Sequence, residues 1–427
     1  MKYTIIFVLC LFISGCGKTP KPGAGEARMS QAPAGPVQVE FWHGMGGPLG
    51  EVLKEMINQF NRSHSDIVVK GVHMGSYDTL QQKIIASLMA KTNPDIAQCY
   101  EALTIKLIDA GKLTALDRFI DADPAFNKAD IVPVLLDNNR YDGVLYSLPF
   151  NKSVPVLYYN KEMFAAAGLD PEHPPANWEE FLEFSRILTK DLDGDGKPDQ
   201  FGQAMTNSAW IFECMLLQAG GRLLSEDGTR VEFDSPEAVE TLDYLIKTLN
   251  EAAYKTTGFD HQNDWIARKA GMVEGSCVSR TYMAANIKFD YGIAPLPAHR
   301  KQAVILSGTN VVLFKSNPDK EKAAWEFIKW FTMPDQTAHW SLSTNYIPVR
   351  KSAIDTPAMK DAITRDPYLK VLFDQLQYAD FEPRQAEWYG SRQLLEQALD
   401  TALIERKDSA GYLKDITVKI IKELSGK

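Results

Sequence analysis

Cysteine and histidine are scarce in this sequence, and the motifs that would turn them into catalysts are missing. The 427 residues include 5 cysteines and 7 histidines. No H-E-x-x-H zinc motif and no G-x-S-x-G nucleophile elbow occurs in the chain. Cys99, Cys214 and Cys277 follow neither a disulfide framework nor a metal-ligand spacing. They are predicted to be small core residues, with one disulfide among them as the alternative.

Basic residues and long apolar runs are also in short supply. The chain has 46 Lys and Arg against 55 Asp and Glu, a net charge of -9 and a pI of about 5.4. This balance argues against nucleic acid as a partner. After residue 13 no apolar stretch is long enough to span a bilayer.

The N-terminus predicts export. Lys2 precedes the apolar stretch 4–13, "TIIFVLCLFI", and Ser14-Gly15 lead to Cys16, so residues 1–15 are predicted to be a signal peptide. Residues 13–16, Ile-Ser-Gly-Cys, resemble a bacterial lipobox, which implies cleavage before Cys16 and lipidation of its thiol. The alternative is an ordinary cleaved signal with a chance cysteine. Residues 16–36 are rich in Gly, Pro and Ala and predict a flexible, lipid-anchored linker on the periplasmic or extracellular face of a membrane.

About 390 residues remain after this linker, which predicts two lobes rather than one core. Alternating apolar residues predict a strand over 37–43, and Leu49, Leu53, Met56, Ile57 and Phe60 lie on one face of a following helix. A strand from 67, a helix over 77–89 and a strand over 94–101 complete a β-α-β-α-β unit. Such a unit implies a parallel α/β sheet with ligands beyond the carboxyl ends of its strands. The loop after Phe41, Tyr77 and Glu101 are therefore expected to face one crevice.

A second unit is predicted from about residue 150. It contains a strand, a Pro-rich loop and a helix capped by Asn177. A strand ends in the prolines of 291–297, and residues 303–314 form two apolar runs broken at Gly308. A helix over 321–332, an extended crossing at 345–350 and amphipathic helices complete the chain.

The stretch "FWHGMGGPLG", residues 41–50, permits two interpretations. A His-Gly-rich turn after a strand can supply an oxyanion-hole amide in a hydrolase, or it can form one lip of a ligand cleft. The missing nucleophile elbow favours the second interpretation, with the amides at the helix start facing the cleft. A carboxylate pair for glycoside hydrolysis is the remaining enzymatic alternative, but no pair is singled out. A structural lipoprotein without a small-molecule site is a third class.

Seven stretches together resemble the extracellular solute-binding proteins of carbohydrate-type ABC importers. They are "FWHGMGGPLG", "GSYDTL", "QCYEA", "LPFNKSVPVLYYNKEMFAAAGLDPEHPPANWEEF", "YGIAPLP", "NYIPVR" and "GSRQLLEQALDTA". The resemblance implies a two-lobed, maltose-binding-protein-like α/β fold of type II with the ligand cleft between the lobes. Residues 37–149 and 302–345 would form the N-terminal lobe, and residues 150–301 and 346–427 the C-terminal lobe.

The resemblance also implies ligand-binding residues and partners. The matching positions are Tyr77, Glu101, Ser153, Trp210, Ser276, Gly308, Tyr346 and Arg392, with Cys277 as an alternative to Ser276. These residues suit a polyol phosphate. The guanidinium group of Arg392 can donate two hydrogen bonds to the phosphate, the Glu101 carboxylate can accept from ligand hydroxyls, and the Trp210 ring offers an apolar face to C–H groups. The predicted ligand is sn-glycerol-3-phosphate or a glycerophosphodiester, and a neutral sugar or oligosaccharide is the alternative. Glycerol phosphate binders of the family have a second tryptophan where this chain has Asn207, so strict specificity for glycerol phosphate is not expected. The expected partners are two permease subunits and an ATPase, the expected protein is a monomer without catalytic activity, and no cofactor is needed for its function.

The stretch "DLDGDGKPDQFG", residues 191–202, predicts a structural Ca²⁺ site. Asp191, Asp193, Asp195 and Asp199 take positions 1, 3, 5 and 9 of a calcium loop, Gly196 takes position 6, and Lys197 would supply its carbonyl. Position 12 is Gly202 instead of a bidentate Glu, so closure of the loop is incomplete. An acidic surface turn is the alternative.

Overall fold

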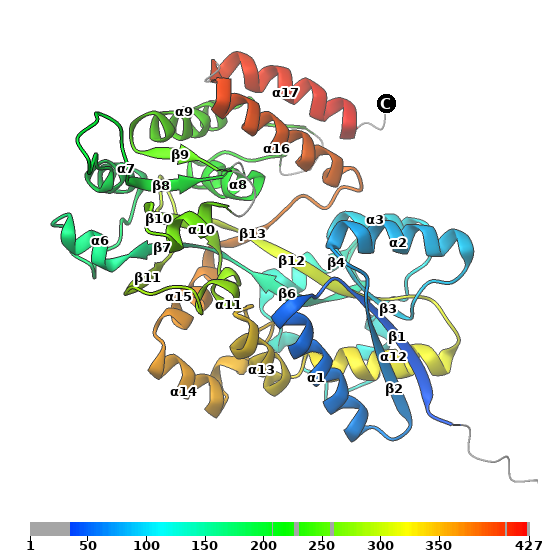
Figure 1. Ribbon diagram of the computed structural model, residues 1–427. Coiled ribbons are helices and arrows are strands. Elements are labelled where there is room, and N and C mark those ends of the chain that lie inside the picture. Colours follow the sequence, from blue (N-terminus) through cyan, green and yellow to red (C-terminus); the bar gives the residue numbers. More distant parts are fainter. Residues whose placement is uncertain (1–34, 207, 226–229, 257–259, 406–407, 425–427) are drawn as a thin grey trace, which may run out of the picture. The chain divides into compact units, whose positions relative to one another are not determined.

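The computed structural model describes residues 35–206, 208–225, 230–256, 260–405 and 408–424 (Figure 1). The predicted signal peptide, Cys16, nearly all of the predicted linker and Asn207 lie outside these ranges. Among the described residues, no helix combines the length and apolarity that a bilayer crossing requires. Cys99, Cys214 and Cys277 are free and buried, which confirms them as core residues.

The first sheet confirms the predicted β-α-β-α-β unit. It contains β1 (Val37–His43), α1 (Gly47–Ser63), β2 (Ile67–His73), α2 (Tyr77–Ala90) and β3 (Ile96–Cys99), and β1 pairs in parallel with β2 and β3. The strand order is β13-β12-β3-β1-β2, with β6 paired to β12. The carboxyl ends of β1 and β3 and the start of α2 therefore come to one edge.

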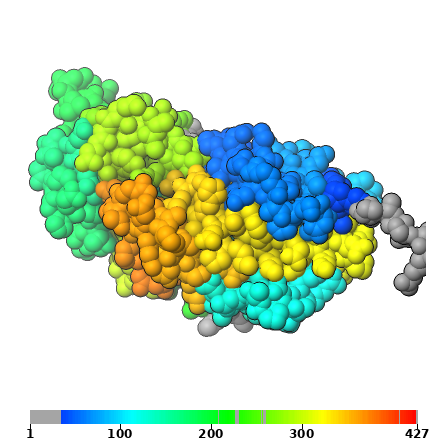
Figure 2. Space-filling view, turned by 90° about the horizontal axis from the view of Figure 1, so that it is seen from below, coloured from blue at the N-terminus to red at the C-terminus, as the bar shows by residue number. Residues whose placement is uncertain are grey.

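Strand alternation decides which helices cover each face of this sheet. Phe41 packs with Phe60 of α1 and Phe327 of α12 (Pro318–Phe331) in one cluster, whereas the adjacent Trp42 packs with Leu80 of α2 in another. Neighbouring strand residues point to opposite faces, so α1 and α12 cover one face and α2 the other. Seen from below, the yellow segments that include α12 and α13 (Pro334–Thr344) lie between the blue segment that includes α1 and the orange segment of α14 (Pro357–Arg365) (Figure 2).

The second sheet has the order β11-β7-β10-β8-β9. Its strands are β7 (Pro155–Asn160), β8 (Phe201–Met205), β9 (Ala253–Lys255), β10 (Ala270–Ser276) and β11 (Tyr291–Ala294), and the helices near it include α6 (Lys161–Ala166), α7 (Trp178–Leu188), α8 (Ala209–Gln218), α9 (Pro236–Glu251), α16 (Trp388–Glu405) and α17 (Ser409–Leu424). Asn177 caps α7 as predicted, because its side chain accepts from the amide of Glu180. Shorter elements are α3 (Glu101–Asp109), α4 (Asp117–Ile120), α5 (Pro133–Asn138), β4 (Arg140–Tyr141), β5 (Val144–Leu145), α10 (Asp260–Ile266), α11 (Ser279–Met283), α15 (Tyr368–Asp374) and β13 (Ala379–Phe381).

β6 and the 345–350 crossing lie side by side where the chain passes between the two sheets. β6 (Ser147–Ser153) pairs with β12 (Val304–Leu313) in the first sheet and continues through Val154 into β7 of the second. The amide of Ile347 donates to the carbonyl of Lys152 at 2.8 Å, which brings the 345–350 crossing beside β6. The predicted lobe boundaries remain a prediction.

The two apolar runs over 303–314 lie in one strand, β12, with Gly308 between them. Gly308 has a φ of +102°, and the register to β6 shifts between Thr309 and Asn310. Glycine tolerates this backbone conformation because it lacks a Cβ, so the strand bends without ending.

Candidate ligand-binding site

A cavity of about 670 Å³ holds six of the eight predicted ligand residues. Tyr77, Ser153, Trp210, Ser276, Gly308 and Tyr346 all line it. They come from the start of α2, the end of β6, α8, the end of β10, the bend of β12 and the 345–350 crossing. The cleft is therefore built from segments of both sheets and from the segments that connect them.

Glu101 and Arg392 lie in an adjoining cavity of about 280 Å³. Tyr77, Tyr100 and Ser307 line both cavities, so the two cavities are neighbours. The eight predicted residues therefore line two adjacent cavities, with Glu101 and Arg392 in the smaller one, the Arg392 subsite.

The tyrosines of the cleft form a hydrogen-bonded group. Asn151 donates from Nδ2 to the hydroxyl of Tyr77 at 2.7 Å, and the hydroxyls of Tyr77 and Tyr346 are 3.5 Å apart. Burial raises the pKa of both tyrosines well above the usual value, so both stay neutral. Neutral hydroxyls can donate to the oxygens of a ligand.

Trp210 offers only its ring to a ligand. Its Nε1 donates to the carbonyl of Ile305 at 2.7 Å, and the side chain of Ser208 caps the start of α8. The indole N–H is therefore occupied, and the exposed part of the residue suits C–H groups.

Ser276 lines the cavity, whereas Cys277 is not among the lining residues. The Cys277 thiol donates to the carbonyl of Asn345, and burial raises its pKa to about 12. A buried, protonated thiol that faces the chain crossing is a packing residue, so the geometry favours Ser276 over Cys277.

Arg392 lies among carboxylates that sequence reasoning missed. Its guanidinium pairs with Glu382 at 3.2 Å and Glu396 at 3.0 Å, and the Arg392 side chain is 30% exposed. Although burial lowers the pKa of Arg392, the carboxyl groups of Glu382, Glu213 and Glu396 raise it above its usual value. A phosphate in this subsite would have to compete with Glu382 and Glu396 for the guanidinium. The i,i+4 spacing of Arg392 and Glu396 was readable in the sequence, but Glu382 and Glu213 had no such signal.

The loop over 41–50 lies partly in the cleft. Gly44, Met45 and Gly46 line the cavity, but the amide of Gly44 donates to Oε1 of Gln98 at 2.6 Å. The amide of Gly44 is therefore occupied, and the predicted orientation of the amides at the start of α1 toward the cleft stays a prediction. His43 lines a separate pocket of about 440 Å³ with His73, and burial followed by the charge of His73 lowers the pKa of His43 to about 4.

The predicted calcium loop is exposed, and its first three carboxylates converge. One oxygen each of Asp191, Asp193 and Asp195 lies within 4.8 Å of the others. Oδ2 of Asp199 accepts from the amides of Leu192 and Asp193 at 2.7 and 3.1 Å, which fastens the loop. These oxygen donors fit Ca²⁺, and Ca²⁺ binding here stays a prediction, including the roles of Asp199 and of the Lys197 carbonyl.

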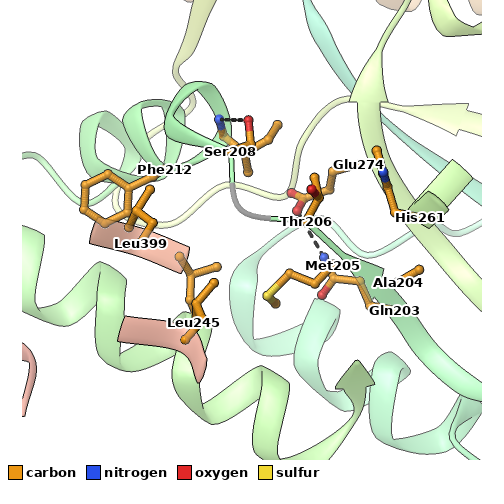
Figure 3. A pocket seen from close by; sticks show the side chains of 12 residues that line it. Gln203, Ala204, Met205, Thr206, Ser208, Phe212, Leu245, His261, Glu274 and Leu399 are labelled. Atoms are coloured by element: carbon orange, nitrogen blue, oxygen red, sulfur yellow. Dashed lines mark hydrogen bonds between the residues drawn. The ribbon is translucent and has the colours of Figure 1, made fainter. Parts of the chain in front are cut away.

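A further pocket beside β8 contains a perturbed carboxyl group (Figure 3). Its volume is about 20 Å³, and Gln203 donates from Nε2 to Glu274 at 3.1 Å. Burial raises the pKa of Glu274 to about 7. None of the predicted ligand residues lines this pocket.

Comparison with known proteins decides the family. Residues 55–369 match the family model described as bacterial extracellular solute-binding protein. The chain belongs to that family. This solute-binding protein is 29% identical over 423 residues to the sn-glycerol-3-phosphate-binding periplasmic protein UgpB of Escherichia coli K12, an alignment that covers 89% of this chain and 93% of the relative. It is 28% identical over 407 residues to the corresponding protein of Yersinia enterocolitica, with 86% and 90% covered.

Solved structures support the maltose-binding-protein-like fold. The cyclic alpha-maltosyl-1,6-maltose binding protein of Arthrobacter globiformis superposes with a TM-score of 0.80 at 26% identity, covering 92% of this chain and 100% of the other. UgpB of Mycobacterium tuberculosis in complex with glycerophosphocholine gives 0.82 at 24% identity, with 92% and 99% covered. The predicted fold class is confirmed. The family and these relatives are binding proteins, so the role of this chain is to bind a solute for an ABC importer.

Proposed function

We propose that this solute-binding protein captures a glycerol phosphate, with a glycerophosphodiester favoured over sn-glycerol-3-phosphate, and delivers it to a permease. The observation that carries the proposal is the position of Arg392, the planar cation of a subsite that lies next to a cavity lined by hydroxyl groups. The sn-glycerol-3-phosphate-binding relatives, which align over most of the chain, support the same ligand class.

Each side chain has a separate task in this proposal. The Arg392 fork donates to two phosphate oxygens. Tyr77 and Tyr346 donate neutral hydroxyls to the remaining oxygens, and Glu101 accepts from a glycerol hydroxyl. The ring of Trp210 covers the carbon atoms. Ser153, Ser276 and the bend at Gly308 supply further polar contacts along the wall.

Charge and space both favour the diester. A phosphate monoester carries about -1.5 to -2 charges near pH 7, whereas a diester carries one. Glu382 and Glu396 already neutralise Arg392, so the lower ligand charge costs less in this subsite. The two adjoining cavities of about 670 and 280 Å³ also offer more space than one glycerol phosphate fills.

A neutral sugar or oligosaccharide is the second candidate. The observation in its favour is the saturation of Arg392 by glutamates, which leaves Trp210 and Glu101 as the main contacts. The Arthrobacter relative, which binds a cyclic maltosyl-maltose, shows that this fold accommodates such ligands.

A thermal-shift screen separates the candidates. Wild-type protein is heated with glycerol 3-phosphate, glycerophosphocholine or maltotriose. A ligand at 100 times its Kd stabilises the folded state by about 2.7 kcal/mol. We expect a rise in Tm with glycerophosphocholine, a smaller rise with glycerol 3-phosphate and none with maltotriose. Mass analysis of the recovered ligand should show it unchanged, because a binding protein does not convert its solute. A rise with maltotriose alone would replace the phosphate assignment by the sugar assignment.

The cellular setting is part of the same proposal. The mature protein begins at a lipidated Cys16, works as a monomer outside the cytoplasmic membrane and presents the closed cleft to two permease subunits that an ATPase drives. The lipobox-like residues 13–16 and the Gly- and Pro-rich stretch that follows support the anchor.

A further inference from the structure

Lys152 is a buried cation at the base of the cleft. Its side chain is 2% exposed, and a lysine is almost never fully buried unless it is paired. Its Nζ donates to Oε1 of Glu101 at 3.0 Å, to Oδ1 of Asn138 at 3.1 Å and to the carbonyl of Gly308 at 3.2 Å. The three donors of the ammonium group therefore each have an acceptor.

Two of these acceptors belong to the cleft. Glu101 lines the Arg392 subsite, and the bend at Gly308 lines the larger cavity. Nδ2 of Asn310 also donates to Oε1 of Glu101, at 2.9 Å. One oxygen of the Glu101 carboxylate is thus held by two donors, which leaves the other oxygen for a ligand.

The backbone of Lys152 reaches more of the cleft. The preceding residue, Asn151, donates to the Tyr77 hydroxyl, and the following residue, Ser153, lines the cavity. The carbonyl of Lys152 accepts from Ile347, which follows Tyr346 in the 345–350 crossing. Segments from β6, β12 and this crossing therefore meet around one residue.

We propose that Lys152 is a positioning residue: its ammonium group holds the Glu101 side chain in place as an acceptor for a ligand hydroxyl and ties that acceptor to the segments that connect the two sheets. The proposal rests on the proposed function in one respect, that Glu101 meets a hydroxyl of the solute. It adds that Lys152 sets the preference for hydroxylated ligands without touching them. A purely structural ion pair would support folding and leave that preference unchanged.

A double-mutant cycle with Lys152→Met and Glu101→Gln tests the positioning role. Affinity for glycerophosphocholine is measured by calorimetry on folded protein, well below the Tm of each variant. A hydrogen bond to a charged group corresponds to a change of about 10- to 100-fold in affinity. Lys152→Met should weaken binding by about that factor in the wild-type background and by less than about threefold in the Glu101→Gln background. Equal losses in the two backgrounds would overturn the proposal.

Ligand preference gives the readout that a structural role would not move. Two analogues of glycerol 3-phosphate are compared with the parent compound, one without the C1 hydroxyl and one without the C2 hydroxyl. Wild-type protein should bind at least one analogue more weakly than the parent compound, and Lys152→Met should erase that difference in affinity. Arg350→Met is the matched control. The Arg350 side chain is also 2% exposed and donates to the carbonyls of Thr332 and Asn127, but it does not line the cleft. The control should lower Tm and keep the preference. An unchanged preference in Lys152→Met would contradict the positioning role.

The positioning role and the ligand class fail in different ways. If wild-type protein binds neither glycerophosphate but binds maltotriose or ribitol, the ligand class is wrong, and the same cycle is run with the bound polyol. Coupling between Lys152 and Glu101 would then still support the positioning role, and its absence would overturn it. If wild-type protein binds none of these probes, both proposals are wrong.

Discussion

Arg392 separates the phosphate assignment from the sugar assignment. Removing one partner of a desolvated charge pair costs about 2–5 kcal/mol, so Arg392→Ala should weaken glycerophosphocholine binding by roughly 30-fold or more. Arg392→Lys should recover only part of this loss because a point charge cannot form the bidentate fork. Trp210→Ala should cost less than Arg392→Ala. Calorimetric titration of the three variants gives the order.

The opposite order identifies a sugar ligand. Arg392→Ala leaves Glu382 and Glu396 without their cation, so its Tm should fall as well. Binding is therefore measured well below that Tm. An Arg392→Ala affinity within about threefold of wild type, together with a severe loss in Trp210→Ala, would remove the phosphate assignment and keep the importer role.

Glu274 should make the folded state less stable as pH rises. Burial raises its folded-state pKa to about 7 from an ordinary value of 4.5. The folded state then binds more protons than the unfolded state between these values, so the free energy of unfolding falls across pH 4.5 to 7. The loss is at most about 3 kcal/mol, and less because Glu274 is partly exposed.

Denaturant titrations of Glu274→Gln from pH 4 to pH 8 test this assignment. The free energy of unfolding of the variant should equal that of wild type near pH 4 and exceed it at pH 8. Glu183→Gln, at an exposed position of α7, should keep the wild-type slope. Parallel curves for wild type and Glu274→Gln would show that another group carries the pH dependence.

At the residue scale, sequence reasoning placed the cleft residues better than their partners. Tyr77, Trp210 and Arg392 stand in stretches that resemble the solute-binding family, and that resemblance implied a common ligand site. Glu382 and Glu213 reach Arg392 through the packing of separate segments. No local pattern encodes that meeting, which is why the acidic character of the subsite appeared only in the structure.

At the scale of elements, Gly308 allows β12 and β6 to lie side by side. A Cβ at this position would lie 1.8 Å from the carbonyl oxygen of Asn151, and the φ of +102° is strained for any L-residue. Gly308→Ala should therefore cost about 3 kcal/mol or more of stability. Gly168→Ala is the control because its φ is +80° with nothing within 4 Å, so only the backbone cost of about 1 kcal/mol remains. If urea unfolding shows that Gly308→Ala and Gly168→Ala lose similar amounts of stability, then the surrounding backbone has shifted to relieve the close approach at residue 308.

The acidic loop between α7 and β8 carries the metal prediction. Ca²⁺ would bridge Asp191, Asp193 and Asp195 and remove their mutual repulsion, so millimolar Ca²⁺ should raise Tm and EDTA should reverse the rise. Asp193→Ala should abolish the response. Calorimetry checks this, with Mg²⁺ as the comparison ion. If neither Ca²⁺ nor Asp193→Ala changes the Tm, the loop binds no Ca²⁺ and is an acidic surface turn.

The elements themselves were largely readable from the sequence. Apolar periodicity gave α1 and α2 within a few residues because each has one buried face. The apolar alternation at the start of β1 gave that strand, although both of its faces are covered. The sequence did not decide whether the apolar runs on the two sides of Gly308 form one strand or two, since glycine permits both a turn and a strand bend. Only the pairing of β12 with β6, a contact between distant segments, selects the bend.

For the whole molecule, the predicted lipid anchor at Cys16 would decide where the protein is found. Cys16→Ser removes the thiol that would be acylated, so the variant should carry no lipid. Intact mass analysis of the wild type should show a diacylated or triacylated N-terminus at residue 16. A lipid-free wild-type N-terminus beyond that residue would contradict the anchor.

The position of β12 in the first sheet has a consequence for how the chain acquires its fold. Residues 310–313 of β12 pair with residues 96–99 of β3. β3 can therefore gain this partner strand only after β12, more than 200 residues later in the chain, has been synthesised and exported. Contacts between such distant residues slow folding because a long loop must close before they form. Until Leu313 has crossed the membrane, β3 is an open strand edge that can pair wrongly. We therefore expect the exported chain to depend on chaperones during the interval between the emergence of β3 and that of β12, and a truncation before residue 304 to aggregate.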